Sequence, residues 1–151
     1  IPKKEIVMTT AIQVADNLLK MYRDAKKPVN GIAIVKMTIL VQAHHLLAFN
    51  KPAFVDPVLT WRYGPNIEDL YHAVKVYDKR DIPDSKVLGG YTITGDLYRT
   101  IENVFVKYSH KGSLDLSAML NANNSSWRYA IENIGKNIPI PHDSLKQDAF
   151  L

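Results

Sequence analysis

Residues 31–49 read GIAIVKMTILVQAHHLLAF, the most apolar stretch of the chain. Apolar residues lie on nearly every side of a helix with this sequence, which is typical of a helix that other elements surround. Four polar side chains interrupt the stretch: Lys36, Gln42, His44 and His45. A membrane span needs about 20 nearly uncharged residues, so these interruptions favour a helix buried inside a soluble protein. We therefore expect residues 31–49 to form the central helix, with Asn30 as its N-cap.

Amphipathic segments on both sides of residues 31–49 predict the helices that cover the central one. Apolar residues recur in them every three or four positions, with capping or chain-breaking residues at the ends. The expected helices are Thr10–Ala25, 66–77, 94–110, 113–120 and 126–134, the last capped by Ser126, with a final turn from Asp143 or Ser144.

Two further segments have other patterns. Residues 54–63 are rich in strand-favouring types, although Pro57 favours an edge strand or an irregular piece. Gly64-Pro65 predicts a turn, and residues 78–93 predict a polar connector with a short strand near Tyr91–Ile93. The predicted fold is mainly α: a single compact domain of six to seven helices around a central buried helix, with a small β element near residues 54–63.

Composition limits the classes of protein. The chain has 151 residues, 46% hydrophobic and 23% charged, as in one globular domain. Cysteine is absent, which excludes a disulfide framework, a thiolate nucleophile and cysteine-ligated metal centres. Since this absence fits a reducing compartment, we expect a cytoplasmic protein. We assign the domain to residues 8–151, with Met8 as the natural initiator. Residues 1–7 lack the apolar core of a signal peptide and are expected to be a cloning remnant or a short N-terminal arm.

The net charge of +4 comes from 19 Lys and Arg residues against 15 Asp and Glu residues. These basic residues are dispersed along the chain, whereas duplex-binding proteins usually carry a dense basic stripe. Nucleic acid is therefore not the expected partner, and a steep salt dependence of binding would indicate it.

Motifs of catalysis are missing from the sequence. It contains no phosphate-binding loop, dinucleotide fingerprint, G-x-S-x-G turn or H-E-x-x-H helix. We therefore predict no enzyme, no catalytic residue, no cofactor and no metal. Glu68 and His72, four residues apart, could chelate a metal, but this spacing is more typical of an exposed helical pair.

Polar residues of the central helix need a separate interpretation. His44 and His45 are adjacent, so their side chains point about 100° apart and do not form a ligand pair. Lys36 must pair or lose its charge if it is buried, which favours a structural salt bridge over a catalytic lysine. We assign Lys36, Gln42 and His45 to a structural polar core. A metal-dependent hydrolase that uses the Lys36/His44/His45 region is kept as an alternative.

The segment Thr60-Trp61-Arg62-Tyr63-Gly64-Pro65 combines two aromatic residues and an arginine with a rigid turn signal. Trp, Tyr and Arg are the residue types enriched at interaction hot spots. We predict that Trp61, Arg62, Tyr63 and Pro65, together with Tyr71, contact a protein partner. Trp61 fits a place in the core equally well. Arg62 is the strongest candidate, because arginine pairs bidentately with acidic groups and stacks on aromatic rings.

Four stretches in the same order resemble a known family. Residues 34–46 match a K-x(5)-Q-A-x-H pattern, and Trp61 to Tyr71 match W-x-Y-G-P-x(5)-Y. The segments 116–127 and 140–150 are similar to the helix, loop and tail that follow. Together they resemble the Panacea (SocA-like) antitoxin domain. The chain departs from the family pattern at three positions: Ile39 for a tyrosine, Asn121 for a histidine and Ser126 for a proline.

This resemblance implies an α-rich, non-enzymatic domain of the kind found in bacterial toxin–antitoxin operons, prophages and phages. Members neutralise unrelated toxins by direct binding, and one branch delivers its toxin to a protease as an adaptor. The resemblance therefore predicts a protein-binding module that neutralises a cognate toxin or another target protein, without a small-molecule substrate or a membrane. A phage-encoded inhibitor of a host defence protein and a protease adaptor are alternatives.

Overall fold

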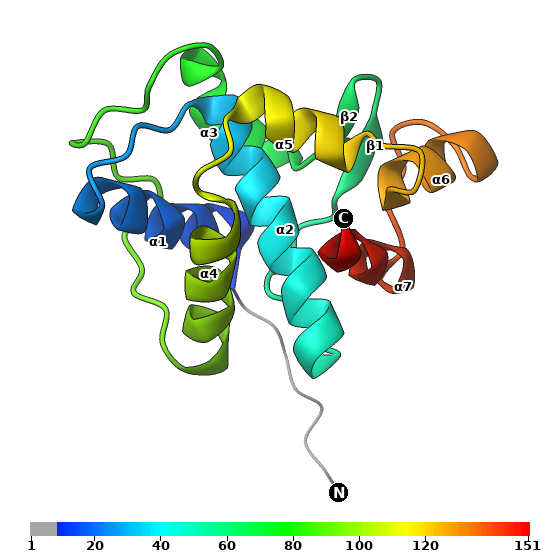
Figure 1. Ribbon diagram of the computed structural model, residues 1–151, viewed down its shortest axis with the longest axis horizontal. Helices are drawn as coiled ribbons and strands as arrows, with labels where there is room; N and C mark the ends of the chain where they lie inside the picture. Colours follow the sequence, from blue (N-terminus) through cyan, green and yellow to red (C-terminus); the bar gives the residue numbers. More distant parts are fainter. Residues whose placement is uncertain (1–8) are drawn as a thin grey trace, which may run out of the picture.

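In the computed structural model of the protein, which describes residues 9–151, helix α2 (Gly31–Phe49) runs through the middle of the molecule (Figure 1). Of its 19 residues, 14 are buried, and its N-cap is Asn30, whose side chain accepts from the Ala33 amide. The helix is long and apolar enough to cross a membrane, but 72% of that stretch lies inside the protein, as in a core helix. The expected initiator Met8 and the expected arm 1–7 lie outside the described residues.

Six further α-helices and a two-stranded sheet surround α2 within residues 9–151. The helices are α1 (Ala11–Asp24), α3 (Glu68–Val74), α4 (Gly95–Tyr108), α5 (Ser113–Leu120), α6 (Ser126–Asn133) and α7 (His142–Leu145). Two 3₁₀-helices extend them, η1 (Lys75–Tyr77) after α3 and η2 (Lys146–Phe150) after α7. The protein is 57% helical and forms one compact domain, which confirms the predicted mainly α class.

Packing follows from the apolar surface of α2. Helices α1 and α4 cover one side of it, and α5, α7 and η2 contact it elsewhere, as Figure 1 shows. Each amphipathic helix places its apolar stripe on this core: Leu18 of α1, Ile101 of α4 and Leu116 of α5 are fully buried. Burial of these side chains supplies the main free energy that favours folding.

The β element differs in detail from the prediction. Strands β1 (Leu59–Trp61) and β2 (Gly64–Asn66) form an antiparallel hairpin in which Trp61 faces Gly64. The turn is thus Arg62-Tyr63, whereas Gly64-Pro65, the predicted turn, begins β2. Gly64 has a φ of +137°, while Arg62 and Tyr63 do not have positive φ. The glycine therefore supplies, directly after the turn, the backbone conformation that lets the second strand return.

No strand forms at Tyr91–Ile93 in the connector, contrary to the prediction. Side chains of α1 take the place of a partner strand. The Asp16 carboxylate accepts from the amides of residues 88 and 90 at 2.8 and 2.7 Å. Asn17 donates to the Tyr91 carbonyl at 2.7 Å and accepts from the Ile93 amide at 3.2 Å. Four main-chain groups of the connector are thus bonded without a ladder, so its polar composition is compatible with a fixed path.

The C-terminal segment is tied to the start of α6. Ser125, rather than the predicted Ser126, is the N-cap, and its side chain accepts from the Arg128 amide. The Asp148 carboxylate of η2 accepts from the Ser126 amide at 2.8 Å and from its hydroxyl at 2.5 Å. Burial raises the pKa of Asp148 to about 6, although both bonds from Ser126 act in the opposite direction. A buried carboxylate thus joins the last helical turn to a helix 22 residues earlier.

Replacing Leu40, which is fully buried in α2, by Ala should lower the free energy of unfolding by about 2–5 kcal/mol, because it removes buried methyl groups and leaves a cavity. Leu47→Ala is the control on the same helix, since Leu47 is 44% exposed, and it should cost much less. Urea unfolding followed by circular dichroism measures both. Equal losses would show that α2 is not the central helix.

Candidate functional site

The β1–β2 hairpin is held from outside by three side chains that donate to its main chain. The acceptors are the carbonyls of residues 61, 63 and 65, and the donors are Trp127 Nε1 of α6 at 2.8 Å, Asn121 Nδ2 at the end of α5 at 2.9 Å and Lys36 Nζ of α2 at 2.8 Å. Because the donors come from three different helices, any shift of the hairpin against these helices would break at least one of the three bonds.

The outer edge of β1 is also occupied. The Thr60 amide donates to the Ile138 carbonyl at 3.0 Å, and the Asn137 amide donates to the Thr60 carbonyl at 2.8 Å. The Thr60 hydroxyl, itself buried, donates to the Gly135 carbonyl at 2.8 Å. The extended chain after α6 therefore acts as a third, irregular strand, and β1 presents no open edge to solvent.

Side chains of the hairpin divide into buried and exposed groups. Pro65 is buried, and Trp61 is half-buried with its ring edge-to-face on Tyr71, 5.1 Å between centroids. Arg62 is exposed, and its guanidinium lies 5.3 Å from the ring centroid of Tyr63, whose side chain is 80% exposed. Of the predicted partner-contacting residues, Arg62 and Tyr63 form the accessible tip, and Pro65 belongs to its frame.

A cavity of about 540 Å³ opens beside this tip. It lies between the hairpin, the first two turns of α2, α3 and α5, and residues that the sequence had singled out line it: Lys36, Trp61, Arg62, Tyr63 and Tyr71. This size is within the range of about 300–1,000 Å³ typical of ligand pockets. The structure thus gathers four of the five predicted contact residues and one residue of the predicted polar core around a single concavity.

Leu114 at the start of α5 is a surface residue that the sequence did not indicate. Its side chain is 86% exposed. It shares a helix face with Ser117, which lines the cavity, and Asn121, which binds the hairpin, because residues three and seven apart lie on one side of a helix. The only signal in the sequence is that Leu114 lies off the buried stripe formed by Leu116 and Leu120.

Lys36 is 6% exposed, and burial lowers its pKa from 10.5 to about 8. The acceptor that it binds is the Pro65 carbonyl. No carboxylate of residues 9–151 forms an ion pair with it. The predicted structural salt bridge is therefore replaced by a hydrogen bond to the main chain, which satisfies one of the three ammonium donors.

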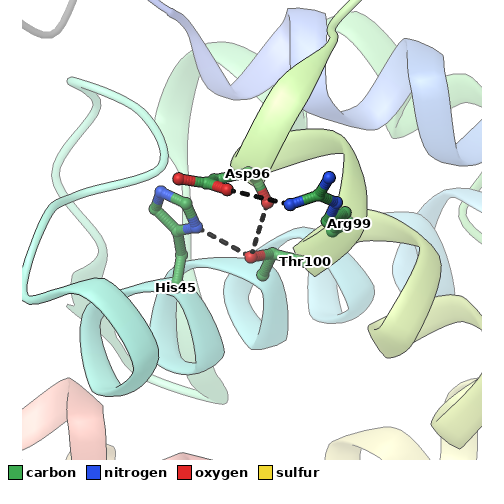
Figure 2. A network of polar contacts seen from close by, with 4 residues as sticks. All are labelled: His45, Asp96, Arg99 and Thr100. Carbon is green, nitrogen blue, oxygen red and sulfur yellow. Dashed lines mark hydrogen bonds and ion pairs between the residues drawn. The ribbon is translucent and has the colours of Figure 1, made fainter.

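The other two residues of the predicted polar core join α2 to its neighbours. Gln42 is fully buried, accepts from the Ala53 amide at 2.6 Å and donates to the Phe54 carbonyl at 3.2 Å. Figure 2 shows the ring of His45 facing Thr100 of α4, with 2.8 Å between Nδ1 and the hydroxyl oxygen. Thr100 also donates to the Asp96 carbonyl. Both side chains act between elements, and burial lowers the pKa of His45.

The residues of the hydrolase alternative do not meet. His44 Nε2 lies 2.8 Å from the Tyr108 hydroxyl, and burial, with the nearby Lys107 charge, lowers its pKa to about 4. His45 faces Thr100, whereas Lys36 is about two turns away at the hairpin. Within residues 9–151 there is also no group of three or more side chains suited to hold a metal. Glu68 and His72 form an exposed pair at 4.0 Å.

Comparison of the chain with protein-family models, curated proteins and solved structures finds no match.

Gly64 gives a direct test of the hairpin geometry. Its φ of +137° is unfavourable for a side chain, and an added Cβ would lie 2.4 Å from Asn121 Oδ1. Gly64→Ala should therefore lower the free energy of unfolding by about 1–3 kcal/mol from backbone strain, with displacement of Asn121 adding to the loss. Gly112→Ala is the control, because a Cβ there meets nothing within 4 Å. Its cost should stay below about 1 kcal/mol. Chemical denaturation that gives equal losses would contradict the hairpin geometry.

Proposed function

We propose that the protein is a non-enzymatic protein-binding module that neutralises a toxin or another target protein by direct binding. The observation that carries this proposal is the tip of the hairpin, where exposed Arg62 and Tyr63 project beside the cavity while their main chain is fixed from three helices. The expectation from the Panacea-like motifs, which include this same segment, supports the same class of function.

Rigidity of the tip favours binding energetically. Side chains and loops lose conformational entropy when two proteins associate. A segment that is already fixed in its bound conformation loses less of it. Tyr63 and Arg62 also belong to the residue types that most often dominate binding energy. Both side chains are exposed and stack on each other at 5.3 Å, which leaves them available to a partner.

The surroundings of the cavity add apolar area for a partner. Tyr63 and Leu114 are 80% and 86% exposed, and they come from two elements that both border the cavity. Large apolar side chains gathered around a concave site are typical of protein-binding surfaces. A partner that covers both residues would bury apolar area and would enclose the mouth of the cavity.

The partner that we propose is a cognate toxin in the cytoplasm, encoded next to this chain. A phage-encoded inhibitor of a host defence protein or a protease adaptor would use the same surface and differs only in the target and in its fate. The hydrolase alternative is not favoured, since Lys36 binds the hairpin, whereas His44 and His45 face Tyr108 and Thr100, about two turns apart on α4.

Arg62→Ala tests the proposal with the protein encoded by the adjacent open reading frame as the candidate partner. Arg62 is exposed and stacks on a side chain that is itself exposed, so the variant should keep the wild-type melting temperature. Its affinity in calorimetry should fall about 30-fold, the effect of a hot-spot arginine worth about 2 kcal/mol. The variant should also protect cells less well than the wild type against growth arrest that the partner causes.

The matched control is Arg99→Ala. Arg99 is an exposed arginine of α4, which lies across α2 from the hairpin in Figure 1, and its loss should leave affinity unchanged. Equal affinity of Arg62→Ala, Tyr63→Ala and the wild type would show that the hairpin tip is not the binding surface. Failure of the wild-type protein to bind or neutralise the adjacent gene product would remove support for the antitoxin function itself.

A further inference from the structure

The cavity beside the hairpin is lined by a buried lysine that forms no ion pair in the described part of the chain. Lys36 lines the cavity, is 6% exposed and donates to the Pro65 carbonyl. A buried ammonium is costly unless it is paired, and in residues 9–151 it forms no ion pair. Two of its three donors therefore have no protein acceptor in that part of the chain, and an anion in the cavity would complete the site.

Other residues of the cavity wall define what kind of anion fits. Trp61 and Tyr71 form an edge-to-face aromatic pair in the wall, which favours a flat apolar group. Arg62 adds a second cation, and Asp78 is the carboxylate that lines the same cavity. With two cations against one anion, the lining suits a ligand with a single negative charge better than a strongly charged phosphate.

We propose that this cavity binds a carboxylate that carries an apolar or aromatic group, with the Lys36 ammonium as its counter-ion and the Trp61–Tyr71 pair as the wall for its apolar part. If the proposed function holds, on which this step rests, the carboxylate belongs to a residue of the partner protein, either an acidic side chain or the chain terminus. A free aromatic carboxylate would have the same chemistry, and the experiments separate these two sources.

The first experiment uses a defined probe on the whole protein. N-acetyl-L-phenylalanine has the carboxylate and the ring, and N-acetyl-L-phenylalaninamide is the same molecule without the charge. In a titration followed by amide chemical shifts, the acid should perturb Trp61, Arg62, Gly64 and Lys36 and saturate. The amide should bind at least about tenfold more weakly, since a charge-assisted bond is lost.

Lys36→Met removes the charge and keeps the length and volume of the side chain. It should lower affinity for the acid about tenfold or more and lower affinity for the uncharged N-acetyl-L-phenylalaninamide far less. Lys36→Gln is a second variant, in which a donor for the Pro65 carbonyl is retained. The dispersion of main-chain N–H signals in the spectrum of each variant reports whether that variant folds. Lys75→Met is the control, because Lys75 is exposed and does not line the cavity; it should bind as the wild type does. Equal binding of acid and amide, binding of neither, or unchanged affinity in folded Lys36 variants would overturn the proposal.

Affinity for the acid should also depend on pH in a set direction. Burial lowers the pKa of Lys36 to about 8 in the free protein, and only the charged form binds the carboxylate. Affinity should thus be constant between about pH 5 and pH 7, where the carboxylate of the probe and the ammonium are both charged, and fall about tenfold per pH unit above about pH 8. Arg62, Tyr63, Tyr71 and Asp78 are the other charged or titratable groups that line the cavity. Because Lys36→Met retains all four, an equal fall in that variant would contradict the assignment to Lys36.

Binding experiments with the partner protein identify the source of the carboxylate. Lys36→Met should weaken binding of the adjacent gene product, and N-acetyl-L-phenylalanine should compete with that binding. If the probe requires Lys36 but the partner binds the variant as tightly as the wild type, the assignment to a partner residue is overturned and a free carboxylate is the ligand. Loss of partner binding in Arg62→Ala but not in Lys36→Met would overturn that assignment in the same way while the proposed function stands. If the adjacent gene product binds no form of the protein, the function fails while the probe still tests the cavity.

Discussion

A helix that is apolar on every side cannot face water, and the arrangement of this protein follows from covering α2. Its polar side chains Lys36, Gln42 and His45 are buried as well, so each must find a partner in the element that covers it. Lys36 binds the hairpin, Gln42 binds the loop at Ala53 and Phe54, and His45 binds α4. These contacts join residues 11 to 55 positions apart. They therefore fix where neighbouring segments lie, whereas apolar burial alone is non-directional.

The functional surface depends on the same constraint. Lys36 fixes the carbonyl of residue 65, and Asn121 and Trp127 fix those of residues 63 and 61. With its main chain held in this way, the hairpin needs no core packing from Arg62 or Tyr63, and both side chains remain exposed. Lys36 thus has two roles in our account. It anchors the segment that presents the tip, and its uncompensated charge gives the adjoining cavity a preference for a carboxylate.

The sequence predicted the elements better than the contacts between them. The apolar stretch with its cap Asn30 identified α2, and an amphipathic pattern identified α5 at Ser113–Leu120, because these signals are local. The turn was misplaced onto Gly64-Pro65, since composition shows that a glycine is needed but not which side of the turn needs it. The salt bridge expected for Lys36 and the strand at Tyr91–Ile93 were wrong for one reason: each group binds a distant segment, Pro65 in one case and Asn17 in the other. Exposure of Leu114 depends likewise on what covers α5.

Hydrogen exchange in the free protein tests most directly whether the hairpin is fixed to the central helix. Main-chain amides exchange when their hydrogen bonds open, so amides of one cooperative unit share similar protection. Our account predicts that the amides of Thr60, Ile138 and Ile140, which join β1 and the preceding Val58 to the chain after α6, exchange nearly as slowly as those in the middle of α2. It also predicts that Lys36→Met accelerates these hairpin amides more than those of α4. Fast exchange of the hairpin amides in the wild type, at rates typical of an exposed loop and unchanged by Lys36→Met, would contradict it.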